Sequence, residues 1–486
     1  MLQIHVDPSR PVALVEQIVS GVRSQIDDRI LRPGMKLPPI RRLAETQQVS
    51  RFTVVEAYDR LVALGYLDSR RGSGFYVSAR RAGGEEPEMI ERVERAVDGA
   101  WLMREITNHA PERVLAAAGD LPPQWLDEDE VLRNLRQLLR RGDTRSTSYG
   151  TPQGYAPLRD QLRIRLAELG IRAQPGQIVL TYGATQALDL VGRYFLKAGD
   201  CVLVDDPGYW NLFSNLRLQG VRLLGVPRNA DGPDTAALEL LLEHHQPRLY
   251  FTQSVLHNPT SSCISPAVAF RLLQLAEKHD FLIADDDIYG DMVQGPATRL
   301  ATLDQLQRVI HIGSYSKTIS GNLRVGYLAC RYDLAQALTD VKIMTALSSP
   351  EFAERMVHLM LTEGHYRKYV ERLHGRLARA TDRTLQLLER VGMVVDQTPA
   401  GGQFVWARVP GLGDSSALAH HGVEHGIVLA PGAVFRPNCQ PSAHLRFNVA
   451  YAEHPRLERF LGETLPRMVE TRACVANPPG SQSVTG

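Results

Sequence analysis

The stretch VIHIGSYSKT, residues 309–318, decides the fold of this chain. Val309 to Gly313 is a short apolar run of the kind that forms a buried strand, and Lys317 follows it closely. A lysine just after a buried strand is delivered to the carboxyl edge of the sheet, where open α/β sheets bind their ligands. Its amine can form a Schiff base with an aldehyde. The stretch therefore predicts a reactive lysine at a sheet edge, although most lysines in so short a motif lie on the surface.

Four further apolar runs precede this stretch and extend the predicted sheet, with helical patterns between them. These runs are residues 178–180, 201–204, 248–251 and 281–284. Strands that alternate with helices are typical of a mostly parallel sheet covered by helices, so we expect an α/β fold. Beyond about residue 365, apolar runs at 404–406 and 445–447 indicate a smaller α+β lobe.

Length and charge indicate more than one domain. The chain has 486 residues, and domains typically have roughly 100–200 residues. The net charge of the whole chain is only +1, but residues 1–81 carry 13 Lys and Arg against 8 Asp and Glu. A basic head on a mildly acidic body suits a small DNA-contacting module. An ordinary basic surface would give the same count.

The cysteines argue against a disulfide framework and against a cysteine-based zinc site. They are few, odd in number and scattered, with no CxxC pair: Cys201, Cys263, Cys330, Cys439 and Cys474. The N-terminus has polar residues where a signal peptide needs an apolar run. No apolar stretch has the length of a membrane span. We therefore expect a cytoplasmic, reduced protein that contacts no membrane.

The first segment predicts three helices followed by a hairpin. Apolar residues with helical spacing run over 15–26, 40–44 and 50–61. Ser50 is a good N-cap for the third helix, and Gly65 is well placed to end it. Apolar runs at 66–68 and 75–77, joined by a glycine turn, predict two strands.

This segment resembles the winged helix-turn-helix of the GntR family over about 70 residues from Val12. The matching motifs are Leu37-Pro38, Arg41, Leu43-Ala44, VSRFTV at 49–54, Ala57-Tyr58 and Gly72-Ser73-Gly74. Pro39-Ile40 replace the small polar residues usual in the family, which predicts the loss of one phosphate contact.

The resemblance implies DNA-binding roles for residues of this segment. Arg51 and Thr53 at the start of the recognition helix would face base edges. Ser50 and the helix N-terminus would meet a phosphate. Three further arginines would neutralise phosphates: Arg41, Arg70 and Arg71. Gly72 belongs to the glycine-rich wing, which is also expected to contact DNA. The alternative is a helical hairpin with solvated arginines, which explains any one residue but not the whole spacing.

Residues about 147–460 resemble fold-type I aminotransferases, and six motifs occur in the family's order. The resemblance implies pyridoxal 5′-phosphate (PLP) as cofactor, bound through Schiff-base chemistry at Lys317. Arg324 stands seven residues later, at the spacing of the family's phosphate-binding arginine. Ser314 and a cup of Gly183, Ala184 and Thr185 at a helix N-terminus complete the predicted phosphate site. Taken alone, the cup would be a simple turn between strand and helix.

The same resemblance assigns the residues around the cofactor ring. Asp286 would meet the pyridine nitrogen, and Tyr289 and Asn258 the phenolic oxygen. Tyr209 would stack on the ring, with Trp210 as a competitor. Ser261 replaces the glycine usual after the asparagine motif, which leaves the path of that loop open.

Three further inferences complete the predicted site. Tyr149 resembles the tyrosine that reaches the neighbouring subunit's phosphate, which implies a homodimer. Arg446 resembles the arginine that clamps a substrate carboxylate. The three carboxylates at 285–287 could instead form a metal loop, but no further carboxylate follows at EF-hand spacing, so we expect no metal.

A winged helix followed by an aminotransferase-like domain is the arrangement of the MocR subfamily of GntR regulators. We expect a DNA-binding domain at 1–78, a linker at 79–112, a PLP-binding domain at 113–470 and a disordered tail at 471–486. The implied function is regulation of transcription at operator DNA in response to PLP or a small amino-acid-like effector. An active class I/II aminotransferase with an auxiliary DNA-binding domain is the alternative, so whether the chain is an enzyme stays open. A regulator that has lost PLP is a third possibility, and Lys317, Asp286 and Arg324 argue against it.

Overall fold

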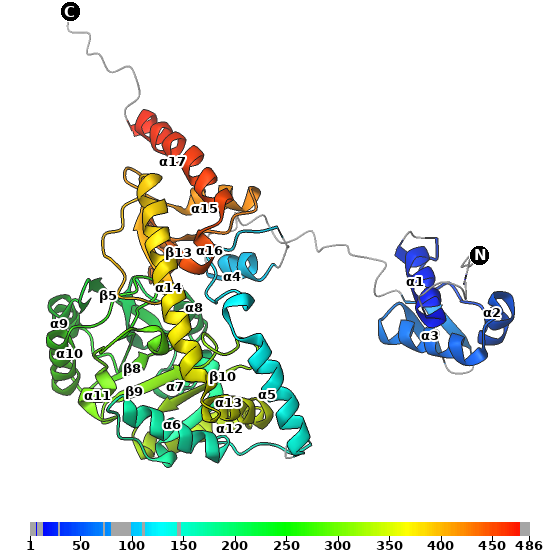
Figure 1. The fold of residues 1–486 in the computed structure, drawn as a ribbon, viewed down its shortest axis with the longest axis horizontal. Coiled ribbons are helices and arrows are strands. Elements are labelled where there is room, and N and C mark those ends of the chain that lie inside the picture. The colour runs from blue at the N-terminus through cyan, green and yellow to red at the C-terminus, as the bar shows by residue number, and fades with distance from the viewer. Residues whose placement is uncertain are drawn as a thin grey trace, which may run out of the picture. The chain divides into compact units, whose positions relative to one another are not determined.

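The computed structural model describes residue 6 and residues 13–27, 30–70, 73–78, 99–108, 112–142 and 147–476. The chain divides into two compact units, Met1–Glu94 and Arg95–Gly486, and the ribbon of Figure 1 shows the fold of each. Among the helices within these described ranges, none is long and apolar enough to cross a membrane.

The N-terminal unit is a winged helix-turn-helix, as the sequence predicts. Its helices are α1 (Leu14–Asp27), α2 (Ile40–Gln47) and α3 (Arg51–Ala63), and its strands are β1 (Leu67–Arg70) and β2 (Gly74–Val77). The strands pair antiparallel, with Leu67 opposite Val77. Ile18, Val54 and Tyr58 are fully buried between the helices and form its core. The hydroxyl of Ser50 accepts a hydrogen bond of 3.0 Å from the Thr53 amide, so the predicted N-cap of α3 is confirmed.

The large unit is built on an eight-stranded sheet with the order β3-β10-β9-β8-β7-β4-β5-β6. The strands are β3 (Ile178–Tyr182), β4 (Cys201–Asp206), β5 (Arg222–Asn229), β6 (Gly232–Pro233), β7 (Leu249–Thr252), β8 (Leu282–Asp286), β9 (Val309–Ser314) and β10 (Val325–Ala329). The ladder from β9 through β8, β7 and β4 to β5 is parallel. The mostly parallel sheet predicted from the alternating pattern is therefore present.

Strands β5, β6 and β10 were not among the predicted strands, and β10 shapes the site. It pairs antiparallel with both β3 and β9, so its first residue lies at the edge where those strands end. Val325 stands opposite Tyr182, and Gly326 opposite Ser314. Arg324, just before β10, is consequently brought to the same edge as Lys317, just after β9.

Helices cover the sheet and connect it to a smaller lobe (Figure 1). They are α5 (Glu128–Arg141), α6 (Ala156–Glu168), α7 (Gly183–Phe195), α8 (Trp210–Leu218), α9 (Thr235–His244), α10 (Pro266–Lys278), α11 (Leu300–Asp304), α12 (Tyr332–Ala346), α13 (Glu351–Thr362) and α14 (His365–Arg390). The predicted smaller lobe holds β11 (Phe404–Arg408), β12 (Ala430–Pro431) and β13 (His444–Asn448), in the order β11-β13-β12. Its helices are α15 (Ser416–Glu424), α16 (Val449–Ala452) and α17 (Pro455–Ala476).

Two predicted boundaries need correction. Helix α17 continues to Ala476, so residues 471–476 belong to a helix rather than to a tail, and residues 477–486 lie outside the described residues. Helix α4 (Gly99–Thr107) falls within the predicted linker but packs into the large unit, where Trp101 and Leu102 are buried. A Cβ on Gly99 would lie only 2.4 Å from the Trp210 ring, because α4 rests closely on α8. Residues 79–98 and 109–111 of the predicted linker lie outside the described residues.

Candidate cofactor site and nucleic-acid interface

Lys317 lies at the carboxyl edge of the large sheet, as its position after a buried strand predicts. Its Nζ donates a hydrogen bond of 2.6 Å to the carbonyl oxygen of Gly119. Loss of hydration lowers the pKa of Lys317 to about 8, with nearby Arg446 and Arg324 acting in the same direction and Asp120 opposing them. The amine is therefore neutral, and nucleophilic, over a much wider pH range than an exposed lysine.

The predicted phosphate cup is formed where β3 meets α7. Gly183, the first residue of α7, has φ +68°, and a Cβ on it would lie 2.8 Å from Nη2 of Arg324. A Cβ on Gly326 would lie 2.6 Å from the Gly183 backbone, so only glycines allow this close approach. Arg324 donates 3.2 Å to the Tyr182 carbonyl oxygen. The first N–H groups of α7 have no partner within the helix, so arginine and helix start together form an anion cradle.

The other residues predicted for the cup lie at the same edge. Ala184 is buried in the first turn of α7, and Thr185 next to it is exposed. The Ser314 hydroxyl accepts from the Ser316 amide at 3.2 Å and donates to the Val325 carbonyl oxygen at 3.3 Å. It thus joins the turn before Lys317 to β10, and a phosphate contact from it stays a prediction.

The three adjacent carboxylates at the end of β8 do not converge on one point. Asp285 accepts from the amide and hydroxyl of Ser254, and Asp287 pairs with Arg299 at 2.7 Å. Asp286 has one oxygen, Oδ2, bonded to the side chain of Gln253 at 3.1 Å. Their separate partners make them unlike the metal loop that the bare sequence left possible.

The environment of the Asp286 carboxylate favours an interaction with a positively charged group. Burial, followed by the neighbouring carboxylates Asp285 and Asp287, raises its pKa to about 8, and Lys317 opposes the rise. Its buried Oδ1 has no hydrogen-bond partner. An unsatisfied buried carboxylate oxygen is costly unless a ligand donates to it, so this atom is the natural partner for a protonated ring nitrogen.

Arg446 and Asn258 contact each other at the inner end of the site. Arg446 donates 2.9 Å to Asn258 Oδ1 and 2.6 Å to the Ala117 carbonyl oxygen, and its guanidinium lies 4.1 Å from the centre of the Phe404 ring. Burial lowers the pKa of Arg446 to about 10, and nearby Tyr289 opposes the shift. Its Nε has no hydrogen-bond partner and could donate to a ligand. Binding of a carboxylate by Arg446 stays a prediction.

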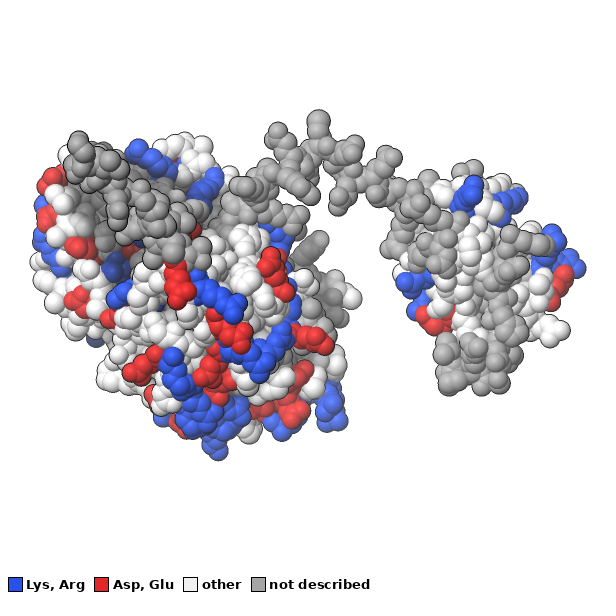
Figure 2. Space-filling view, turned by 90° about the horizontal axis from the view of Figure 1, so that it is seen from above, with Lys and Arg blue, Asp and Glu red and all other residues white. Residues whose placement is uncertain are grey.

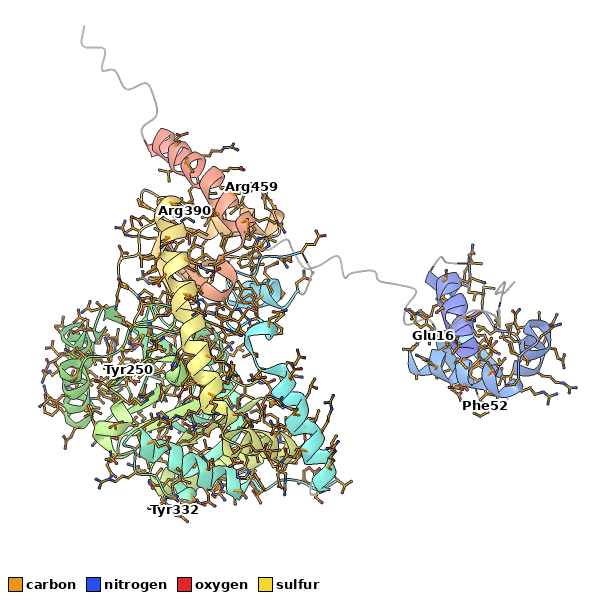
Figure 3. All side chains as sticks on the ribbon, viewed as in Figure 1. Glu16, Phe52, Tyr250, Tyr332, Arg390 and Arg459 are labelled. Atoms are coloured by element: carbon orange, nitrogen blue, oxygen red, sulfur yellow. The ribbon has the colours of Figure 1, made fainter. Side chains whose placement is uncertain are left out.

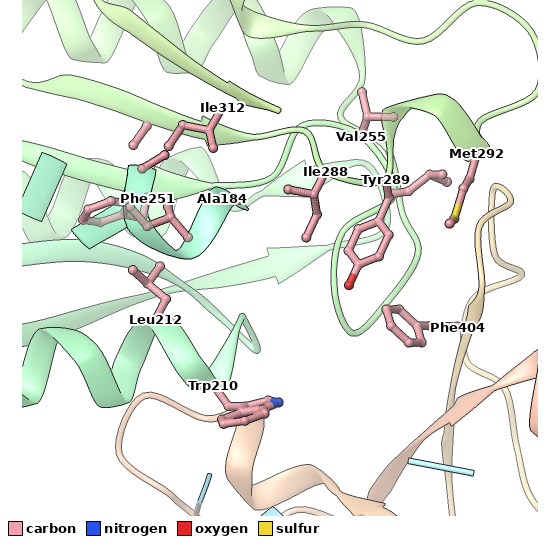
Figure 4. Close-up of a cluster of buried hydrophobic side chains, with 14 of the residues drawn as sticks. Ala184, Trp210, Leu212, Phe251, Val255, Ile288, Tyr289, Met292, Ile312 and Phe404 are labelled. Atoms are coloured by element: carbon pink, nitrogen blue, oxygen red, sulfur yellow. The ribbon is translucent and has the colours of Figure 1, made fainter. Parts of the chain in front are cut away.

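The predicted ring-contacting tyrosines also reach the site. Tyr289 is buried, burial raises its pKa, and its ring meets Phe404 edge-on at 5.4 Å between centroids (Figure 4). Tyr209 and Asp286 line one small pocket. Trp210, the competitor for stacking, is buried beneath α4, which favours Tyr209. Tyr149 is 84% exposed in this single chain, so its reach into a neighbour stays a prediction.

The loop after Asn258 takes an unusual path without the family's glycine. Ser261 has φ +54°, a left-handed conformation that usually favours glycine. Its hydroxyl donates 2.9 Å to the Phe404 carbonyl oxygen and so ties the loop to the smaller lobe. The side chain thus gives the loop an anchor that glycine could not provide.

Two parts of the site were missed from the sequence. Gln253 donates to Asp286, while its Oε1 accepts 2.8 Å from the Asn258 amide, so it sets the position of both. The segment from Ala117 to Asp120 crosses the site and is held by Arg446, Lys317, Gln403 and Asn448. The place of Gln253, two residues after the predicted strand at 248–251, could have pointed to a side chain at the sheet edge. The Ala117–Asp120 segment carries no motif that would have revealed it.

In the N-terminal unit, the described side chains expected to contact DNA lie at the start of α3 or on α2. Arg51 is exposed, while Thr53 shares a 2.7 Å hydrogen bond with the Ser50 hydroxyl. Arg41 is exposed and pairs with Glu45 at 3.2 Å. The Arg70 side chain, Arg71 and Gly72 lie outside the described residues. Pro39 precedes α2 without a side-chain cap, in accord with the departure from the family motif.

Phe52 is a further candidate for DNA contact that the motif did not reveal. It is the second residue of α3, and it is 75% exposed. Figure 3 shows it at the outer surface of the N-terminal unit, and Figure 2 shows blue basic side chains at several places on that unit. An exposed aromatic ring between Arg51 and Thr53 offers an apolar contact for a thymine methyl group.

Both units match known families. Residues 119–463 match the family model for aminotransferase class I and II, and residues 14–77 match that for bacterial regulatory proteins of the gntR family. The chain is 33% identical to 2-aminoadipate transaminase of Thermus thermophilus over 347 residues, which cover 69% of this chain and 85% of the relative. It is 29% identical over 433 residues to the HTH-type transcriptional regulator TauR of Rhodobacter capsulatus, with 85% and 88% covered.

A solved relative supports the same fold. The crystal structure of LysN, the α-aminoadipate aminotransferase from Thermus thermophilus, in complex with N-(5′-phosphopyridoxyl)-L-leucine, aligns with a TM-score of 0.67 and 28% identity. The alignment covers 77% of this chain and 95% of LysN. The large unit therefore has the fold of PLP-binding aminotransferases.

Proposed function

Because the chain belongs to the aminotransferase class I and II family and carries a gntR-family DNA-binding domain in front of it, as MocR regulators do, we propose that it is a cytoplasmic transcription regulator. Its cofactor is pyridoxal 5′-phosphate. In this proposal, operator binding by the N-terminal unit responds to a small amino compound at the Lys317 site. The protein acts as a homodimer in which the DNA-binding domain, residues 1–78, is joined by a linker to an aminotransferase-like domain that begins with α4 and ends with α17.

The described residues fit the cofactor. Gly183 and Arg324 would hold the phosphate, the free Oδ1 of Asp286 would accept from the ring nitrogen, and Tyr209 would cover the ring. The cofactor supplies an aldehyde that reacts with amines and a ring that withdraws electrons. The pKa of Lys317 is lowered to about 8. A larger fraction of its amine is therefore neutral, and the neutral amine is the form that reacts with such an aldehyde. These roles rest on family spacing together with the contacts described above.

One observation carries the regulatory part of the proposal: the segment that follows the linker, from Ala117 to Asp120, passes through the cofactor site. Gly119 O accepts from Lys317 at 2.6 Å and from Gln403 at 2.8 Å. Asn448 donates to Ala118 O and Asp120 O, and Arg446 donates to Ala117 O. A ligand that draws Lys317 or Arg446 away from these carbonyl groups changes the segment that leads back to the DNA-binding unit.

The chemistry of the site indicates the class of effector. Arg446 suits a carboxylate, because a guanidinium binds a carboxylate through two hydrogen bonds. The group next to Lys317 would be an amine. An amino-acid-like effector satisfies both, and closure of the smaller lobe over it would alter the spacing of the two DNA-binding units in the dimer. Such a switch requires that the effector bind the two states with different affinity.

DNA binding is tested by selection from a random oligonucleotide pool. We expect the full chain to enrich one sequence motif, and Arg51→Ala to lose it with a penalty of about 1–3 kcal/mol. Arg60→Ala is the matched control, since Arg60 lies in the last turn of the same helix and pairs with Glu16. Enrichment of the same motif by Arg51→Ala would reject the assignment of α3 as the DNA-reading helix.

A working aminotransferase is the second candidate, because Lys317, Asp286 and Arg446 meet in one site and one relative is a transaminase. It is tested by incubating the PLP-loaded chain with pairs of amino donors and keto acids and measuring product. Rapid turnover, with DNA affinity that no amino compound changes, would favour the enzyme over the regulator.

A further inference from the structure

Three side chains of types that can bind metal ions lie close together at the C-terminal end of α15. His421, Glu424 and His425 each offer one ligand atom, and these atoms lie within 4.8 Å of one another. Positions i, i+3 and i+4 place them on one face of the helix. The cysteine spacing that argued against a zinc site does not bear on this cluster, because it contains only histidine and glutamate. It lies on the smaller lobe, and none of its residues has a role in the cofactor site.

The two imidazole rings are held in place by their neighbours. Nδ1 of His425 lies 2.9 Å from the His421 carbonyl oxygen, so it carries the proton and leaves Nε2 free to bind a metal. Metal-binding histidines commonly donate their other N–H in this way. The ring centroids of His421 and His425 lie 4.4 Å apart, and both rings pack on Phe460 of α17. This packing reduces the motion that a metal would otherwise have to arrest.

The charges around the cluster also suit a cation. Carbonyl groups at the C-terminal end of a helix carry partial negative charge, and Glu424 lies 3.1 Å from Nδ1 of His421. Arg456 is the nearby cation, but its Nη2 donates 2.8 Å to the His425 carbonyl oxygen and its Nη1 donates 2.5 Å to that of Glu112. Its guanidinium is therefore engaged with backbone carbonyl groups rather than with the Glu424 carboxylate.

We infer that His421, Glu424 and His425 form a site for a divalent transition-metal ion of the Zn²⁺ class. Two imidazoles and one carboxylate form a known protein ligand set for Zn²⁺, and the exposed position leaves room for water as a further ligand. The cluster adjoins the segment that leads from α4 toward the cofactor site, because Gly426 O accepts a hydrogen bond of 2.9 Å from the Val114 amide. A bound ion would stabilise this attachment.

The test uses the full chain without an affinity tag, loaded with PLP and freed of metal by a chelator. Zn²⁺ is titrated against a chromophoric chelator to obtain Kd, with Mg²⁺ as the control ion because it prefers oxygen ligands. We expect one Zn²⁺ per chain that His421→Ala and His425→Ala each weaken by roughly 10- to 100-fold or more. Glu424→Gln should weaken binding less. His420→Ala is the matched control, since His420 lies on the same helix outside the cluster, and it should bind as wild type does.

Thermal unfolding gives a second readout. Zn²⁺ should raise the melting temperature of wild type and of His420→Ala, but not of His425→Ala. Wild-type binding no tighter than that of His425→Ala would overturn the proposal, and so would equal losses in His420→Ala and His421→Ala. Circular dichroism of each variant shows whether it is folded. A variant that fails to fold is replaced by the corresponding glutamine substitution, which keeps the helix while removing the imidazole.

Discussion

Lys317 illustrates how a single residue acquires its chemistry from its position. Its motif predicts a reactive amine, but the depressed pKa arises from burial and from Arg446 and Arg324, which are near only in the folded chain. Asp286 changes in the opposite direction, because burial and two adjacent carboxylates favour its protonated form. A cofactor that donates a hydrogen bond to Asp286 relieves part of this cost.

The lowered pKa predicts how fast PLP attaches to the cofactor-free chain at different pH values. Below about pH 8 most of the Lys317 amine is protonated and cannot attack an aldehyde. The attachment rate should therefore rise with pH up to about 8 and then level off, which stopped-flow absorbance can follow. Lys317→Ala is the control and should yield no borohydride-stable lysine adduct. A rate that continues to climb until about pH 10.4, as for an unperturbed lysine, would contradict the assignment.

Phe52 allows a test at the level of one methyl group. If its ring packs on a thymine in the selected operator, then replacing that thymine by deoxyuridine removes the methyl contact. Wild type should lose about 0.8 kcal/mol, roughly fourfold in Kd, whereas Phe52→Ala should bind both DNAs equally. Fluorescence anisotropy at one salt concentration measures this cycle. Equal sensitivity of both proteins to the substitution would show that Phe52 does not read the methyl.

The family resemblance, rather than residue types alone, pointed to the residues of the proposed site but not to their supporting contacts. Lys317, Arg324 and Asp286 could be found because each follows or precedes a strand at a fixed spacing in the sequence. The position of Gln253, two residues after the predicted strand at 248–251, placed it near the sheet edge, but its contacts could not be predicted, because they involve a carboxylate 33 residues later and a backbone amide five residues later. Neither partner forms a local pattern with it.

At the scale of elements, four strands of the parallel core were predicted, whereas its fifth strand β5 and the antiparallel β10 were not. Strands β7 and β8 are buried along their whole length, and β9 is buried except at its last residue, so each contains an apolar run in the sequence. β10 is equally buried, but its residues were assigned only to the motif of the phosphate-binding Arg324 and not to a strand. The stretch from Glu88 to Ile106 is charged, with sparse apolar positions, so a helix was expected there but within the linker. The burial of α4 depends on the distant Trp210, which no local pattern reveals.

The start of α7 gives a prediction at this scale. Gly183→Ala forces a side chain into a left-handed conformation and places Cβ 2.8 Å from Arg324. We expect PLP affinity to fall by roughly tenfold, because a strained residue costs about 1–3 kcal/mol and Arg324 must move. Equilibrium dialysis measures the Kd.

Gly375→Ala is the matched control for this change. Gly375 lies within α14, and a Cβ there meets only the Arg379 side chain at 3.5 Å. It should leave PLP affinity unchanged and raise stability by about 0.5–1 kcal/mol. Unchanged PLP affinity in Gly183→Ala would exclude the cradle at α7 as the phosphate site.

At the scale of the whole molecule, the proposed dimer predicts complementation between two defective chains. If Tyr149 serves the neighbouring site, a hybrid of Tyr149→Phe with Lys317→Ala contains one site in which both residues are native. This site should bind PLP with wild-type affinity, whereas the Tyr149→Phe homodimer should bind more weakly. Purified hybrids carrying two different tags allow the comparison. A hybrid that binds as weakly as the Tyr149→Phe homodimer would show that Tyr149 does not act across subunits.

The central claim is that a ligand at the Lys317 site changes DNA binding by the N-terminal unit. The most direct measurement titrates labelled operator with the PLP-loaded chain while amino acids are added, in wild type and in Arg446→Ala. Wild type should change its operator Kd by about 5- to 150-fold with one amino acid, which is the usual range of coupling between sites. Arg446→Ala should bind the operator with unchanged Kd and ignore that amino acid. An operator Kd in wild type that stays constant while the same amino acid is observed to bind would contradict the account.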